Sequence, residues 1–303
     1  MKICVTGTQG QVATALQELA VQAGIAVHCL GRPAFDLGQP DNAEAVLAAL
    51  KPDVLISAAA YTAVDLAEGH AEEAYRVNAA GPAALARASG NLGIPILHLS
   101  TDYVFDGLKR TPYMESDITG PCSVYGASKL EGEYAVAAGN PCHVILRTAW
   151  VYSHSGKNFL RTMLRIAETN PVVRVVSDQF GCPTYATDIA AALIAIARQV
   201  VVKAAGDPAF GTFHMTGRGD TSWAGFAGAI FAMAAKGGHA AARVVPIATS
   251  DYPTPARRPE NSRLDCGKLA DVFGVELPHW HDGTERCLAR LFQMSESLQG
   301  AAP

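Results

Sequence analysis

The sequence predicts an α/β protein with a Rossmann-type, doubly wound parallel sheet and a smaller C-terminal substrate lobe. Three observations support this fold class. Short apolar segments alternate with helical segments through the first half of the chain, a glycine turn follows the first apolar segment, and glycine or proline residues separate the elements. Strands separated by helices pair in parallel through right-handed crossovers, so their carboxyl ends meet at one edge of the sheet.

The expected elements follow from apolar periodicity and from the breakers between them. Strands are expected at residues 2–6, 25–30, 53–58, 94–99 and 143–147, and helices at 11–22, 41–50, 71–90 and 123–138. Later helices are expected at 158–169, 187–202, 221–236 and 284–294, with extended segments at 172–176 and 212–215. We expect an NAD(P)-binding domain over 1–150, its core extending to about residue 215, and a substrate lobe mainly over 151–303, the chain crossing between them.

The first expected strand leads into a turn with the spacing Gly-x-x-Gly-x-x-Ala, formed by Gly7, Gly10 and Ala13. A strand, a glycine turn and a helix open a dinucleotide-binding unit, in which the helix N-terminus offers free N–H groups to a pyrophosphate. Gly7, Gly10, Gln11 and Val12 are therefore predicted to bind the cofactor. The spacing differs from the usual dehydrogenase fingerprint, so a plain turn is the alternative.

Further candidate cofactor residues follow the second and third strands. NAD-preferring proteins usually carry an acid after the second strand, whereas this chain has Gly31 and Arg32. Arg32 could pair with a 2′-phosphate, which favours NADPH and leaves NADH possible; a solvated arginine is the alternative. Small side chains at Ala58, Ala59 and Ala60 would let the cofactor pass close to the backbone, or they serve only tight packing.

The catalytic prediction rests on residues 100–107 and on the pair Tyr125 and Lys129. Tyrosine and lysine four residues apart share one face of a helix, where the ammonium can stabilise a tyrosinate and make the phenol a usable proton donor. A hydroxyl from Thr101 or Ser100, arriving at the end of a strand, would hold a carbonyl oxygen beside that phenol. Asp102 could orient the hydroxyl, bind substrate or cap a turn. The arrangement predicts hydride reduction of a carbonyl.

With these motifs, the sequence resembles the extended short-chain dehydrogenase/reductases and, within them, the dTDP-4-dehydrorhamnose reductases. The resemblance runs from residue 1 to about residue 291 and is carried by segments 58–65, 99–107, 125–129, 147–152, 156–159, 177–184 and 253–265. It implies reduction of the C4 ketone of dTDP-6-deoxy-L-lyxo-4-hexulose to dTDP-L-rhamnose with NADPH or NADH. The product is a precursor of cell-surface polysaccharide.

The resemblance also implies roles for individual residues. Tyr125 would protonate the new C4 oxygen, and Lys129 would tune the phenol and hold the nicotinamide ribose. Thr101, in preference to Ser100, would bind the sugar. The remaining implied contacts are Asp36 and Leu37 beside the adenine, the Trp150 ring against the sugar, and for the rest of the substrate Asp102, Asn158, Gln179, Arg258 and Asn261.

Two points stay open within this resemblance. An arginine fork suits a diphosphate, but the sequence does not decide between Arg257 and Arg258. Some family members bind magnesium at a dimer interface through acids in the first helix and after the Pro-Thr motif. Here Ala15 stands at the first place and residues 185–187 lack an acid. We therefore expect no metal site, and a monomer or weak homodimer.

Composition excludes several other classes. The 303 residues are 49% hydrophobic with a formal net charge of −4, which leaves no basic footprint for nucleic acid. Seven scattered cysteines without a Cys-x-x-Cys pair are expected to be reduced thiols of a cytoplasmic protein. The N-terminus begins a strand at once, and no apolar run reaches about 18 residues, so neither a signal peptide nor a membrane span is expected.

Two alternative functions remain compatible with the residues. One is another nucleotide-sugar enzyme, such as a 4-epimerase or a dehydratase. Tyr103 and Val104 follow Asp102, so the acid pair of a dehydratase is missing, whereas an epimerase and the identity of the nucleotide base stay open. The other is a non-catalytic, NADP-binding regulatory subunit, against which the intact Tyr125 and Lys129 pair argues.

Overall fold

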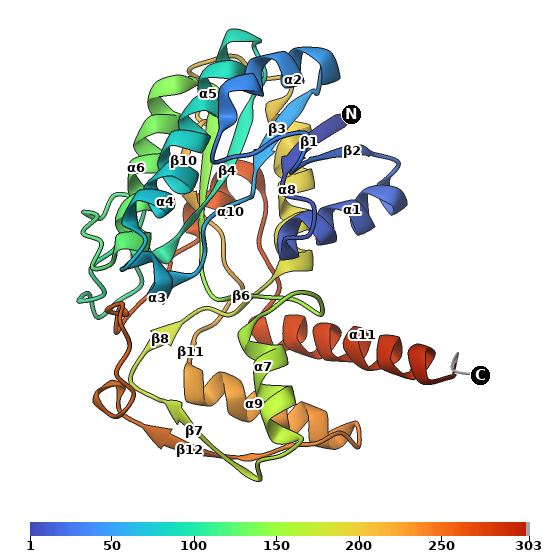
Figure 1. Ribbon diagram of the computed structural model, residues 1–303, viewed down its shortest axis with the longest axis vertical. Helices are drawn as coiled ribbons and strands as arrows, with labels where there is room; N and C mark the ends of the chain where they lie inside the picture. The colour runs from blue at the N-terminus through green and yellow to red at the C-terminus, as the bar shows by residue number, and fades with distance from the viewer. Residues whose placement is uncertain (301–303) are drawn as a thin grey trace.

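A parallel sheet of six strands forms the centre of the computed structural model, which describes residues 1–300 (Figure 1). The strand order is β10-β5-β4-β3-β1-β2, and all neighbouring strands pair in parallel. The strands are β1 (Lys2–Thr6), β2 (Ala26–Leu30), β3 (Val54–Ser57), β4 (Ile96–Thr101), β5 (His143–Thr148) and β10 (Gly211–His214). The predicted doubly wound sheet is confirmed, and its order reverses at β1, where such sheets bind ligands.

Helices cover both faces of the sheet because buried side chains alternate along each strand. Ile3 and Val5 pack in one core with α1 (Gln11–Ala23), α8 (Ala186–Val200) and α10 (Gly267–Phe273). Cys4, between them, points to the opposite face of the sheet and packs there with α2 (Ala43–Leu50), α5 (Gly81–Asn91) and α6 (Val124–Gly139). The two helix layers flank the sheet in Figure 1.

Two expected elements differ from the structure in ways that affect the site. The helix expected at 71–90 consists of α4 (Ala71–Tyr75), a π-helical turn (Arg76–Ala80) and α5, preceded by the short α3 (Val64–Ala67). The strand expected at 94–99 is β4 at Ile96–Thr101, since Pro95 has no N–H to donate to a ladder. Thr101 therefore ends the strand and lies at the carboxyl edge of the sheet.

The chain after β5 builds a second core and then returns to the sheet. This core is formed by α7 (Phe159–Ala167), α9 (Trp223–Lys236) and α11 (Trp280–Gly300). Short strand pairs frame it: β6 (Val151–Tyr152) with β9 (Thr184–Tyr185), β7 (Val172–Val176) with β12 (Arg243–Ile247), and β8 (Phe180–Gly181) with β11 (Thr221–Ser222). Between these segments, α8 and β10 rejoin the sheet, so the chain crosses between the two cores more than once.

The remaining helical turns are short 3-10 segments, at Pro40–Asn42, Asp102–Val104 and Thr249–Asp251. The seven cysteines are all free thiols. Among residues 1–300, no helix has both the length and the apolar character that crossing a membrane requires.

Candidate active site

The glycine turn after β1 presents an open helix N-terminus. Gly7 has φ +96°, a left-handed conformation that favours glycine, and a Cβ there would lie 3.6 Å from that of Ala59. Gly10 is the N-cap of α1, where no side chain caps the helix and no acid occupies the first turn. The first N–H groups of α1, which include Gln11 and Val12, are thus available to an anion.

Thr6, which the sequence analysis did not single out, joins the turn to the end of β3. Its Oγ1 accepts hydrogen bonds from the N–H groups of Ala58 and Ala59, each at 3.0 Å. These bonds hold residues 58–60, which follow β3, beside Gly7, which follows β1, at the point where the strand order of the sheet reverses. A threonine that ends a buried strand carries no distinct sequence signal, because its partners are fifty residues away.

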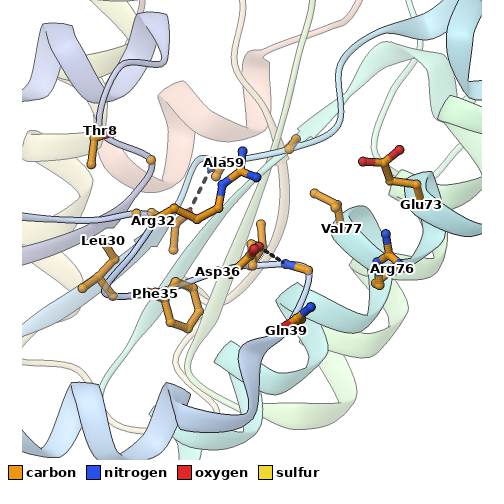
Figure 2. A pocket seen from close by; sticks show the side chains of 16 residues that line it. Thr8, Leu30, Arg32, Phe35, Asp36, Gln39, Ala59, Glu73, Arg76 and Val77 are labelled. Carbon is orange, nitrogen blue, oxygen red and sulfur yellow. Dashed lines mark hydrogen bonds between the residues drawn. The ribbon is translucent and has the colours of Figure 1, made fainter.

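A cavity of about 400 Å³ opens beside this turn, and Figure 2 shows its lining. Of the predicted cofactor residues, it is lined by Gly7, Arg32, Asp36, Leu37, Ala59 and Ala60. Arg32 and Arg76 lie on two sides of Asp36, whose Oδ1 accepts the N–H of Gly38 at 2.9 Å (Figure 2). The sequence analysis did not predict Arg76 as a cavity residue, because an arginine within a helix has the sequence pattern of a solvated surface residue. The cavity lining thus carries two cations, Arg32 and Arg76, and two carboxylates, Asp36 and Glu73, of which Asp36 is engaged with the backbone.

Close backbone packing holds the helix that carries the predicted catalytic pair. The Ser123 side chain caps α6 by accepting the N–H of Gly126 at 3.1 Å. A Cβ at Gly126 would lie 2.2 Å from the carbonyl oxygen of Tyr103, and one at Gly132 would lie 2.1 Å from that of Asn78. Any larger residue would displace α6, so these glycines keep Tyr125 and Lys129 against the end of β4.

Tyr125 and Thr101 meet at the carboxyl end of β4. Burial raises the pKa of Tyr125 to about 12, and a hydrogen bond with the Thr101 side chain offsets part of this rise. The phenol is therefore protonated near neutral pH. The Lys129 ammonium donates to the Leu99 carbonyl at 2.7 Å and lies 3.3 Å from His98, and its tuning of the phenol stays a prediction. A protonated phenol suits a proton donor.

The structure separates the two neighbouring hydroxyls that the sequence left in competition. Ser100 donates to Oε1 of Glu133, deep in the molecule. Arg147 holds that carboxylate with Nε at 2.9 Å and Nη2 at 2.7 Å, so the serine is part of a buried ionic network. Thr101, one residue on, is on the Tyr125 side. Alternation along the strand thus directs Thr101, and not Ser100, toward the phenol.

Trp150 occupies a strained position at the junction of the two cores. Its φ is +48°, which is uncommon for a residue with a large side chain. The ring stacks on Trp223 with 3.5 Å between ring centroids, and a Cβ on Gly181 would lie 2.4 Å from it. The packing against Trp223 and Gly181 therefore fixes the orientation of the Trp150 ring. Its predicted contact with the sugar stays a prediction.

Three of the predicted polar contacts have side chains that bind within the protein. Asn158 caps α7 and donates to Gln11 Oε1 at 3.0 Å, which links the two cores. Asn261 donates to two backbone carbonyls and accepts from Arg263. Gln179 donates to Thr249 Oγ1 at 3.0 Å. These contacts give each residue a scaffold function, and their contact with substrate stays a prediction.

The side chains of Arg257 and Arg258 have different surroundings. Arg258 pairs with Asp65 at 2.8 Å and hydrogen-bonds Tyr103, whose ring packs edge-on against Tyr125. Arg257 is exposed. Arg258 is therefore the arginine on the side of the predicted catalytic pair, a distinction that residue type alone could not make.

Ala15, where some relatives of the resembled family have an acid, is buried in the core between α1 and the sheet. In the part of the chain that the structure describes, no group of three or more His, Cys, Asp or Glu side chains is arranged to hold a metal ion.

Comparison with known proteins agrees with this geometry. The family model for the RmlD substrate binding domain matches residues 1–293. A dTDP-4-dehydrorhamnose reductase of Sinorhizobium fredii is 50% identical over 286 residues, which cover 94% of this chain and 96% of that protein. The chain belongs to the dTDP-4-dehydrorhamnose reductase family. The resemblance inferred from the motifs is thereby confirmed, and with it the oxidoreductase class.

Solved structures show the same fold. A dTDP-4-dehydrorhamnose reductase of Clostridium acetobutylicum superposes with a TM-score of 0.89 at 35% identity, covering 96% of this chain and 100% of the other. A second, from Bacillus anthracis and solved in complex with NADP, has a TM-score of 0.88 at 31% identity, covering 95% and 99%. The similarity therefore includes the core formed by α7, α9 and α11 as well as the sheet.

Proposed function

We propose that this protein reduces the C4 ketone of dTDP-6-deoxy-L-lyxo-4-hexulose to dTDP-L-rhamnose with NADPH. The observation that carries the proposal is the Tyr125 phenol hydrogen-bonded to the Thr101 side chain, at the sheet edge that also holds the glycine turn. A phenol and a hydroxyl at one point can bind a ketone oxygen and protonate it. Membership of a family whose curated members are named for this reaction supports the substrate.

The residues around the cavity fit NADPH. The uncapped N-terminus of α1 suits a pyrophosphate, and Arg32 with Arg76 suits a 2′-phosphate. Asp36, one of the two acids in the cavity lining, accepts the Gly38 N–H. The NADP found with the Bacillus anthracis relative supports the same choice. NADPH supplies the hydride when bound, and the remaining chemistry belongs to the chain.

The chain's part in the reaction is to orient the sugar and transfer a proton. Thr101 and Tyr125 hold the ketone oxygen, and the Tyr125 phenol gives its proton to that oxygen as the carbon is reduced. The Lys129 ammonium then stabilises the tyrosinate that remains. Trp150 orients the sugar, and Arg258 faces the diphosphate. We assign these roles to a cofactor domain over 1–150 and a substrate lobe mainly over 151–303.

We further propose that the protein works in the cytoplasm as a monomer or weak homodimer, without nucleic acid. Its substrate and cofactor are both highly charged nucleotides, which supports a cytoplasmic location, and its net charge of −4 disfavours binding a phosphate backbone.

The test follows NADPH absorbance with the dTDP-4-keto-6-deoxy sugar formed in situ by the preceding enzymes, in the presence of EDTA. We expect NADPH oxidation stoichiometric with dTDP-L-rhamnose, and loss of turnover by about 10²-fold or more in Tyr125→Phe with cofactor binding retained. In a parallel assay with a nucleotide sugar that carries a C4 hydroxyl, conversion to its C4 epimer without net NADPH consumption would indicate an epimerase. Binding of NADPH without consumption would indicate a regulatory subunit.

A further inference from the structure

A fully buried histidine, His98, contacts the side chain of Lys129, the lysine of the predicted catalytic pair. His98 is in the middle of β4, and its Nε2 lies 3.3 Å from Nζ of Lys129 on α6. On its other side, Nδ1 lies 3.0 Å from Oγ of Ser57, the last residue of β3. The imidazole thus connects two neighbouring strands of the sheet to the helix that carries Tyr125.

The charge state of this imidazole follows from its surroundings. Burial holds the pKa of His98 well below its ordinary range, and the nearby Lys129 charge lowers it further. The ring is therefore neutral and has one N–H. Because an ammonium can only donate, Nε2 must be the acceptor, and Nδ1 carries the proton and donates it to Ser57.

The lysine has only three N–H bonds, and the structure accounts for two of them. One donates to the Leu99 carbonyl at 2.7 Å, and another donates to His98 Nε2. The tetrahedral geometry of the ammonium leaves one N–H for the remaining direction. Tyr125 lies one helical turn earlier on the same face of α6, so this N–H is free for the catalytic side.

We propose that His98 is a positioning residue that holds the Lys129 ammonium, and keeps it charged, so that its third N–H serves the Tyr125 site. The proposal rests on the proposed reductase function, because it assigns His98 to the same site. His98 touches neither substrate nor the reacting atoms, and it acts only through Lys129. Ser57 is compatible with this assignment, because its hydroxyl oxygen can accept the Nδ1 proton.

The electrostatic setting makes this acceptor consequential. Burial lowers the pKa of Lys129 to about 8, and Glu133 on the same helix partly opposes that shift. Glu133 is itself shared with Arg147 of β5, so its charge is largely compensated. Tyr125 of α6 and His98 of β4 also face the lysine, and both are neutral near pH 7 because burial raises the pKa of Tyr125 and lowers that of His98. Without the His98 acceptor, deprotonation of Lys129 becomes easier.

The test compares His98→Leu with His98→Gln, whose amide oxygen can replace Nε2 as acceptor. In His98→Leu we expect kcat at pH 7 to fall about 10-fold, and the alkaline limb of the kcat profile to move about one pH unit lower. His98→Gln should recover most of both effects. His214→Leu is the matched control, since His214 is equally buried on β10 and its ring contacts only backbone carbonyls among the hydrogen bonds described. The control should lower stability without moving the limb.

A second measurement separates this proposal from the proposed function. The ε-carbon of [13C]lysine-labelled protein reports the Lys129 titration directly, with the resonance assigned by its absence in Lys129→Met. A lower Lys129 pKa in His98→Leu, restored in His98→Gln, supports the positioning role even if no reductase activity is found. Unchanged titration and an unchanged kcat profile in a folded His98→Leu protein would overturn it.

Discussion

The hydroxyl of Thr101 donates a hydrogen bond to Oδ1 of Asp102, with 2.9 Å between the oxygens. A threonine hydroxyl has one proton, and Oγ1 also accepts the N–H of Tyr103. Thr101 therefore engages Asp102 and the Tyr103 backbone at the same point where its side chain hydrogen-bonds the Tyr125 phenol. The Thr101 and Asp102 side chains thus fix the position of a hydroxyl beside the phenol.

Replacement of Thr101 tests this arrangement. Thr101→Val keeps the shape of the side chain and removes the oxygen, so we expect kcat/KM to fall by about 10- to 100-fold, the value of one or two hydrogen bonds. Thr101→Ser retains the hydroxyl and should stay within a few-fold of the natural protein. Steady-state kinetics of the two variants test this, and a loss in Thr101→Ser without one in Thr101→Val would show that the methyl group, and not the hydroxyl, is required.

Asp102 makes stability depend on pH. Burial raises the pKa of Asp102 to about 7, although hydrogen bonds from Ser262 and Thr101 oppose the shift. Between about pH 4 and 7 the folded protein keeps a proton that the unfolded chain has released, so stability should fall as the pH rises through this range. The side chain of Asp102→Asn does not titrate in this range, so the variant lacks this contribution to the pH dependence. Urea unfolding of both proteins from pH 4 to 8 should show the natural protein losing stability relative to the variant, and parallel curves would contradict the assignment.

Arg32 and Arg76 should together set the preference for NADPH. Removing either arginine removes a cation facing the predicted 2′-phosphate, so Arg32→Ala and Arg76→Ala should each weaken NADPH binding by about 10- to 100-fold. NADH binding should change little. Isothermal titration with both cofactors measures this, and Arg87→Ala, an exposed arginine on α5 outside the cavity lining, is the control. An equal loss for NADH and NADPH would exclude the 2′-phosphate role.

The buried pair of Glu133 and Arg147 should matter for stability more than for binding. Both side chains are buried, and the guanidinium grips the carboxylate with two nitrogens. Glu133→Gln leaves the arginine charge uncompensated and should cost about 3–5 kcal/mol in the free energy of unfolding. The double variant Glu133→Gln with Arg147→Met should lose less than Glu133→Gln alone. Chemical denaturation of the natural protein and both variants measures their free energies of unfolding. A Glu133→Gln protein as stable as the natural one would show that the pair does not contribute to stability.

Much of the fold and part of the site were predictable from the sequence, because they depend on local patterns. Alternating apolar strands and helices, with glycine and proline between them, specify a doubly wound sheet without any long-range information. The Gly7 turn is a strand followed by a helix, and the Tyr125 and Lys129 pair is a four-residue spacing on one helix. Each signal lies within a few residues of the chain.

The tertiary structure decided the contacts that join distant segments. Whether Ser100 or Thr101 faces the phenol depends on the pleat of β4 against α6, and whether Arg257 or Arg258 turns inward depends on Asp65, nearly two hundred residues earlier. Arg76 reaches the cavity beside the glycine turn, and His98 reaches Lys129, only because helices pack on the sheet at those points. Side-chain partners across such separations are set by packing, which no local pattern encodes.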